Sequence, residues 1–335
     1  MQNGVLQWPC LQMTDIVSGV GLFCSACSHR LCKSSLVCRS TSRSTMQSTW
    51  QNLFHDTDHY LQSLKTFGAA CGEFAVYVQW METIIQETVV PKLKGALDQQ
   101  GDLRVMGVGS GSGLMDYKLL VTLLQQFPRI TNCVLEPLEE QLMKYHSLIE
   151  SQALEQRGVN FEWRQQTIEQ YEKAGSSAKF HFIIAMHVLY YFDNLEDSLM
   201  YLYSILKPGG IIMVVISSDD SGTSRFRSHM GPYHETYSVT SSADVRNVLD
   251  HHGISYSQHH ERFHVNITSC FDDASEEGSM VLDFLNHVTK FKESATEDLK
   301  QQVLERLASS ECSETTGDEI LLNNDCDTII ISKPR

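Results

Sequence analysis

A glycine-rich segment, VMGVGSGSGLMD, spans residues 105–116 and includes a short apolar run. Glycines in such a segment permit positive φ angles and let a ligand approach the backbone closely. A Walker loop would end in Gly-Lys-Ser/Thr, which this segment lacks. A dinucleotide fingerprint needs a small residue where this chain has Leu114. The segment therefore predicts a cofactor site that is not built for a pyrophosphate, with Gly107, Gly109, Gly111 and Gly113 as its candidate residues.

An acidic residue follows the next apolar run of the chain. Glu136 ends the segment NCVLE, and an acid at that place can accept both hydroxyl groups of a ribose. A glycine loop and a ribose-binding acid without a phosphate-binding device suit a nucleoside cofactor that carries no phosphate. The segment LKPGG (206–210), frequent in class I methyltransferases, agrees with S-adenosylmethionine as that cofactor. The alternative is that Glu136 is a solvated charge at a strand end.

Alternating strands and helices must position these residues. Apolar runs predict buried strands, and helical periodicity fills the stretches between them. Such alternation is typical of an α/β fold with a doubly wound, mostly parallel sheet, whose ligands bind beyond the carboxyl ends of the strands. We expect strands at 103–109, 132–137, 159–166, 180–189 and 209–217, and ligand-binding segments at 109–113, 136–141, 186–191 and 216–224.

Flanking elements complete a single predicted domain over residues 47–335. We expect a helical N-terminal cap at 54–98, a cofactor-binding half at 99–217 and substrate-side elements at 218–335. The cap is predicted to contain helices at 59–68 and 73–98, the second kinked or divided near Pro91. The substrate side is predicted to hold helices at 241–252, 279–291 and 296–308, strands at 262–271 and 327–332, and a loop at 218–233.

The first 46 residues differ from the rest in composition. They hold five of the ten cysteines and are rich in serine and arginine. One Cys-x2-Cys pair with His29 nearby is weak evidence for zinc, so a disordered extension is the favoured interpretation and a mitochondrial transit peptide an alternative. The segment HHERFH (259–264), together with His251 and His252, shows no ligand spacing. It favours a solvated face, and no metal is expected.

Charge and composition restrict the possible partners. The net charge of −15 argues against a nucleic acid partner and is compatible with a cationic small molecule. No apolar run reaches the roughly 18 residues that a membrane span needs. The scattered cysteines beyond residue 46 suggest a reducing compartment, so a cytoplasmic protein is expected. No obligate protein partner is evident, and a monomer is expected.

From about Leu53 to Lys333 the chain resembles the histamine N-methyltransferases. The resemblance is collinear and rests on LFHDTDHYLQSL, VLEPLEEQLMKY, LYYFDN, LDFL and LLNND. It implies an enzyme that transfers a methyl group from S-adenosylmethionine to an imidazole nitrogen of histamine. An N-methyltransferase for another imidazole or amine, such as a histidine-containing dipeptide, is one alternative. A catalytically weak relative that still binds the cofactor is another.

The resemblance also implies a cofactor site. Gly107 and the segment from Gly109 to Gly113 would form the cofactor loop. Glu136 would bind the ribose, with Gln141 beside it. Thr167 and Ile168 would flank the adenine, although the family typically has Ser at the second position. Met186 would lie on the cofactor side of its strand.

The acceptor site implied by the resemblance departs from the family in two places. Glu73 and Asn324 match the family's amine-binding Glu and Asn, and aromatic lining positions correspond to Tyr60, Tyr190, Tyr191 and Phe284. His187 replaces a Gln, and the segment SGTSRFRSHMGPY replaces a tryptophan-rich stretch. His187 could orient the acceptor or act as a general base. Alternatively, it is a satisfied histidine at a strand end.

Overall fold

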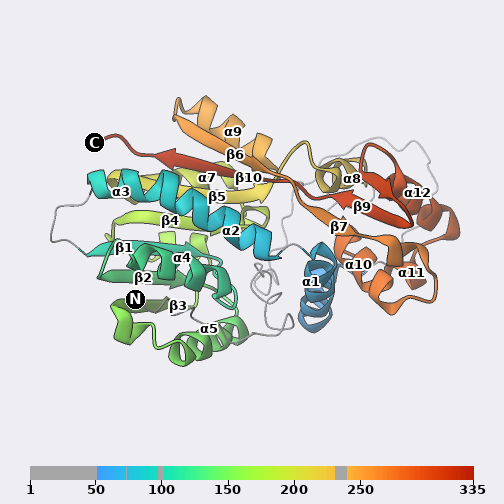
Figure 1. Cartoon of the computed structure of the whole chain (residues 1–335), viewed down its shortest axis with the longest axis horizontal. Helices are drawn as coiled ribbons and strands as arrows, with labels where there is room; N and C mark the ends of the chain where they lie inside the picture. Colours follow the sequence, from blue (N-terminus) through green and yellow to red (C-terminus); the bar gives the residue numbers. More distant parts are fainter. Residues whose placement is uncertain (1–50, 73, 97–101, 231–239) are drawn as a thin grey trace, which may run out of the picture.

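A seven-stranded sheet forms the centre of the computed structural model, which describes residues 51–72, 74–96, 102–230 and 240–335 (Figure 1). The first five strands run parallel, and β10 is inserted antiparallel between β5 and β6. In the order β3-β2-β1-β4-β5-β10-β6 the strands span Val159–Arg164, Ile130–Leu135, Leu103–Val108, Phe180–Met186, Leu206–Ser217, Cys326–Ser332 and Tyr256–Glu261. The predicted doubly wound, mostly parallel sheet is confirmed.

Helices cover both faces of the sheet. Successive strand residues point to opposite faces, so Val105 packs in the apolar cluster on one side and Met106 in the cluster on the other. Both residues are fully buried, as expected for a parallel sheet covered on two sides. One face carries α2 (Phe74–Ile84), α3 (Val90–Ala96), α4 (Leu114–Leu124) and α5 (Glu139–Ser151), and the other carries α6 (Ile168–Lys173), α7 (Leu195–Ser204) and α9 (Ser242–His251).

The helix predicted at 73–98 is divided near Pro91, as the sequence suggests. Its described part consists of α2, a π-helical turn at Ile85–Val89, and α3. Proline cannot donate the backbone hydrogen bond that would continue an α-helix. The preceding turn widens instead, and the Val90 N–H donates to the Ile85 carbonyl, five residues back.

A second apolar cluster lies beyond one end of the sheet, where a small lobe is formed (Figure 1). Residues far apart in sequence, including Leu64, Phe226, Val281 and Val303, are buried together there. The lobe contains a three-stranded sheet in the order β7-β9-β8. Its elements are α1 (Thr57–Cys71), α8 (Gly222–Met230), α10 (Glu276–Asn286), α11 (Phe291–Ser294), α12 (Glu297–Ala308), β7 (His264–Asn266), β8 (Ser313–Thr316) and β9 (Glu319–Asn323).

The predicted loop at 218–233 is wrong over much of its length, because residues 222–230 form α8. Serine, threonine and glycine are weak helix formers, which is why the segment resembles a loop. Tertiary burial of Phe226 and Met230 outweighs that preference. The Ser221 hydroxyl also accepts a hydrogen bond from the Ser224 N–H, which caps the first turn.

Two predicted strands are shorter in the structure. The segment 180–189 leaves the sheet after Met186, because His187 adopts a left-handed backbone with φ of 49°. The segment 262–271 forms only the three residues of β7, followed by a 3-10 helix at Thr268–Phe271. The predictions for residues 1–46 fall outside the described residues. Within the described ranges, no helix is long and apolar enough to cross a membrane.

Candidate functional site

The glycine loop connects β1 to α4 in a left-handed conformation. Gly109, Gly111 and Gly113 have φ angles of 62°, 55° and 78°. Gly113 is the N-cap of α4, and a Cβ atom there would overlap the ring of Tyr145. Both the backbone angle and the packing therefore require glycine at this position. The result is a bare, buried backbone at the carboxyl end of β1, of which Gly109 lines the adjacent pocket.

Glu136 follows β2 and is completely buried beside this loop. One carboxylate oxygen accepts the Gly111 N–H at 2.8 Å, and the other accepts the Leu138 N–H at 3.0 Å. Each oxygen keeps a further lone pair, so the carboxylate can still accept two hydroxyl groups. Burial raises the pKa of Glu136 to about 7, opposed by these two hydrogen bonds and assisted by the nearby Asp116 carboxyl group.

A pocket opens next to the loop at the carboxyl ends of β1 and β2. It encloses about 280 Å³, counting solvent at its mouth. Thr167 and Ile168, the residues expected to flank the adenine, lie in its wall, and the Thr167 hydroxyl is engaged in capping α6. The wall is therefore mostly apolar, and a flat heteroaromatic ring fits its chemistry. The lining residues are Val108, Gly109, Leu135, Gln166, Thr167, Ile168, Glu169, Val188, Tyr191 and Phe192.

Gln141 lies in the first turn of α5 and is fully buried. Among the described residues, neither its side-chain oxygen nor its nitrogen has a hydrogen-bond partner. A buried amide without partners costs free energy, about 1–3 kcal/mol per group. A polar ligand beside Glu136 would satisfy both atoms. Together with the bare loop and the Glu136 carboxylate, this buried amide without partners fits a nucleoside cofactor.

His187 stands where the chain leaves β4. Its left-handed backbone is held by a 2.8 Å hydrogen bond from its N–H to the Val215 carbonyl. Such strain in a non-glycine residue commonly marks a functional position. Its Nδ1 atom lies 3.2 Å from the Tyr190 hydroxyl. Burial, together with the positive charge of Arg227, lowers the pKa of His187 to about 4, so the imidazole is neutral at pH 7.

Tyr190 in turn is fixed by Ser217, the last residue of β5. The Tyr190 hydroxyl accepts the Ser217 N–H at 2.9 Å and lies 2.9 Å from the Ser217 hydroxyl. If the Tyr190 hydroxyl donates its hydrogen bond to Ser217 Oγ, its oxygen can also accept a hydrogen bond from His187 Nδ1–H. This arrangement leaves His187 Nε2 as an acceptor.

Aromatic rings surround His187 on the side of α2. The Tyr77 ring centroid lies 6.2 Å from that of His187 and 5.8 Å from that of Trp80. The Phe263 ring contacts both Tyr77 and Trp80. The Tyr77 hydroxyl is buried and has no partner among the described residues. Sequence reasoning missed Tyr77, because its place in a helix made it indistinguishable from a core residue.

The predicted aromatic residues join the pocket to the lobe. The hydroxyl groups of Tyr60 and Tyr191 lie 2.7 Å apart, and Tyr191 also lines the pocket. Phe284 packs against Tyr60, with ring centroids 6.2 Å apart. The Arg227 guanidinium lies over the Phe284 ring at 6.0 Å. Sequence reasoning missed this arginine because it fell in a segment predicted to be a loop.

Asn324 is tied to α8. Its side-chain oxygen accepts a 2.9 Å hydrogen bond from the Thr223 hydroxyl, one helical turn before Arg227. Thr223 and Arg227 therefore lie on one face of α8. Met186 is the half-buried last residue of β4, and Glu73 lies outside the described residues. Apart from Glu73, the structure brings the predicted site residues together around the carboxyl ends of the central strands.

Comparisons with known proteins agree with this geometry. A family model described as a methyltransferase domain matches residues 77–259, more than half of the chain. Histamine N-methyltransferase of Danio rerio is 28% identical over 296 residues, covering 85% of this chain and 99% of that protein. The Mus musculus protein of the same name is 27% identical over 300 residues, covering 85% and 99%. The solved YcgJ protein of Bacillus subtilis has a TM-score of 0.47 at 14% identity, covering 72% and 96%. The chain belongs to the methyltransferase domain family and is an S-adenosylmethionine-dependent methyltransferase.

Proposed function

We propose that this protein transfers a methyl group from S-adenosylmethionine to a ring nitrogen of a small imidazole-bearing amine, with histamine as the first candidate. The observation that carries the proposal is the neutral His187 packed between the rings of Tyr77 and Tyr190, beside Tyr191, which lines the cofactor pocket. The collinear similarity to histamine N-methyltransferases over nearly their full length supports it.

The chain's own residues would hold the cofactor as follows. Glu136 accepts the ribose hydroxyls, and Gln141 supplies its amide beside them. Thr167 and Ile168 flank the adenine in the apolar pocket. The loop Gly109–Gly113, preceded by Gly107, approaches the rest of the cofactor, with Met186 on the same side of β4. When bound, S-adenosylmethionine supplies a methyl group on a sulfonium, ready for in-line displacement.

Positioning of the acceptor would provide most of the catalysis. An imidazole has a pKa near ~6.5, so much of it already carries the lone pair that attacks at pH 7. His187 Nε2 accepts the N–H of the other ring nitrogen and orients the ring. S-adenosylmethionine would supply the methyl group to this nitrogen and leave as S-adenosylhomocysteine. The ring N–H proton would then pass to water, because a histidine with a pKa of about 4 is a weak base. Tyr60, Tyr190, Tyr191 and Phe284 enclose the acceptor, with Asn324 and Glu73 as its polar contacts.

Cofactor affinity is expected to depend on pH through Glu136. The buried carboxyl group has a pKa of about 7 without ligand, so it is protonated in more acidic solution. Ribose hydroxyls donate to the charged form, so affinity should fall about tenfold for each pH unit below 7 and level off above it. The measurement is the dissociation constant of S-adenosylmethionine across pH, relative to that of Glu136→Gln.

The relative measurement removes the cofactor's own titrations. Glu140→Gln is the matched control, because Glu140 is exposed in the first turn of α5, close to Glu136 in the chain, and pairs with Lys144. It should follow the wild-type pH dependence. A constant ratio between wild type and Glu136→Gln from about pH 5.5 to 8.5 would show that Glu136 does not bind the ribose.

A histidine-containing dipeptide is the second candidate acceptor, and Arg227 favours it. The positive charge of Arg227 reaches His187, since it contributes to lowering that histidine's pKa. A guanidinium repels the ammonium group of histamine, but it binds a carboxylate through paired hydrogen bonds. A dipeptide such as carnosine carries both an imidazole and a carboxylate. Arg227 therefore gives this acceptor an anchor that histamine cannot use.

Product identification tests the proposal directly. The full chain is incubated with methyl-labelled S-adenosylmethionine and either histamine or carnosine, and the product is analysed by mass spectrometry and NMR. We expect the label on a ring nitrogen of at least one acceptor. Label on the primary amine would contradict the proposed acceptor atom. Tight cofactor binding without methylation of either compound would instead identify a catalytically weak relative.

A further inference from the structure

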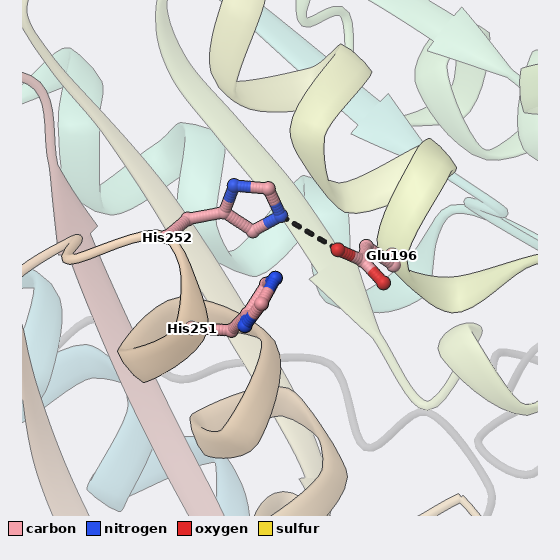
Figure 2. Close-up of side chains that lie close together, drawn as sticks. All are labelled: Glu196, His251 and His252. Carbon is pink, nitrogen blue, oxygen red and sulfur yellow. Dashed lines mark hydrogen bonds and ion pairs between the residues drawn. The ribbon is translucent and has the colours of Figure 1, made fainter.

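Two histidines and a glutamate lie together on the surface, and none of the three lines the cofactor pocket. Figure 2 shows His251 and His252, at the end of α9, facing Glu196 in the first turn of α7. One ligand atom from each residue lies within 4.8 Å of the other two. His252 Nε2 is 2.7 Å from the nearer Glu196 oxygen. The sequence alone could not predict this group, because Glu196 is distant in the chain.

The backbone on both sides of this cluster is fixed by the fold. Helices α7 and α9 bury Leu199 and Val245 in the same apolar cluster on one face of the sheet. The Asn194 side chain caps α7, and the His252 N–H donates to the Val248 carbonyl at the end of α9. Rotation of the three side chains is therefore enough to bring their ligand atoms into contact with one ion.

The ligand types select the class of ion. Two imidazoles and one carboxylate suit Zn²⁺ and its first-row neighbours, whereas Mg²⁺ and Ca²⁺ prefer oxygen ligands. The rings of His251 and His252 are nearly perpendicular, at 86°, with centroids 5.1 Å apart, so both can present a nitrogen to one point. The negative end of the α9 helix dipole, together with the net charge of −15, also favours a cation there.

We propose that Glu196, His251 and His252 form a binding site for a divalent transition-metal ion of the Zn²⁺ class, with water completing the coordination. The ion would bridge the end of α9 and the start of α7. It would therefore stabilise the folded protein without taking part in methyl transfer. Without an ion, the exposed contact between His252 and Glu196 contributes little to stability.

The test is a titration of the full, chelator-treated chain with Zn²⁺, followed by calorimetry and thermal unfolding. Thiolates are ligands for soft metals and five cysteines lie in residues 1–46, so a parallel titration with Co²⁺ distinguishes nitrogen and oxygen ligands from thiolates by absorption spectra. We expect one Zn²⁺ per chain at the His/Glu site and a rise in the unfolding midpoint with Zn²⁺ but not with Mg²⁺.

Matched variants make the outcome decisive. His251→Ala, His252→Ala and Glu196→Gln should each weaken this site about tenfold or more and abolish the Zn²⁺-dependent rise in the midpoint. His55→Ala, which removes another exposed histidine, should leave both unchanged. All three ligands are exposed, so the variants should unfold like wild type in chelator. Identical Zn²⁺ affinity and stoichiometry in wild type and His251→Ala would overturn the proposal.

Discussion

Replacing Arg227 by Gln is expected to lower kcat/KM for carnosine by about 10- to 150-fold, while leaving kcat/KM for histamine unchanged or higher. A hydrogen bond between charged groups contributes about 1.5–3 kcal/mol, which corresponds to that range. The guanidinium lies over the Phe284 ring, and its charge reaches His187. Histamine has no carboxylate and gains nothing from this cation. The measurement is steady-state kinetics with both acceptors under the same conditions.

Arg225 offers a matched control on the same helix. It is exposed, and its guanidinium contacts Asp220 and the Glu311 carbonyl. Arg225→Gln should leave the ratio of the two kcat/KM values as in wild type. Equal losses on both acceptors in Arg227→Gln would mean that Arg227 supports the pocket but does not select the substrate. In that case the imidazole methylation itself would stand, and only the preference for a carboxylate would fail.

The sheet was predictable because its strands are buried on both faces. Ile183 to Ala185 and Ile211 to Val215 are continuous apolar runs, and between helical segments such runs are typical of parallel strands. The place of β10 was not predictable, because insertion between β5 and β6 depends on pairings distant in sequence. The same holds for the lobe, where α8 becomes a helix only through burial of Phe226 and Met230.

The cofactor side of the site was easier to predict than the acceptor side. Gly113 and Glu136 are recognisable because local backbone geometry and strand ends dictate their positions. Tyr77 and Arg227 come from a helix and from a segment without clear periodicity. Their place in the site follows only from the fold, which packs the Tyr77 ring near His187 and sets the Arg227 guanidinium over the Phe284 ring. The roles of the individual residues stay predictions, which the variants at positions 136, 187 and 227 test.

Substituting Gln for His187 is the second change with a large expected effect. Gln offers a donor and an acceptor, as a neutral imidazole does, but it places them on a different, more flexible side chain. We expect histamine turnover to be kept or raised, because the histamine N-methyltransferases that the chain resembles have Gln at this position, and the preference for histamine over carnosine to rise about tenfold. Unchanged preference between the two acceptors would show that position 187 does not contribute to substrate selection.

The pH dependence of activity and of stability distinguishes protonation of the acceptor imidazole from protonation of His187. The pKa of His187 is lowered to about 4, so it stays neutral down to mildly acidic pH, and acid inhibition near pH ~6.5 should come from protonation of the acceptor imidazole. This acid inhibition should therefore be the same in wild type and His187→Gln. Stability should differ. In the unfolded chain His187 takes up a proton as pH falls below about 6.5, so wild type should lose stability toward pH 4 relative to His187→Gln.

His181 provides the control for this comparison. Burial lowers its pKa to about 4 as well, but it lies at the start of β4, where Nδ1 accepts the Arg104 N–H. His181→Gln should alter acid stability without changing acceptor preference, because the two histidines stand at opposite ends of β4. If His181→Gln shifts the preference as His187→Gln does, the effect of position 187 comes from general destabilisation of the strand. If only His187→Gln shifts it, the residue that replaces the family's Gln distinguishes one imidazole acceptor from another.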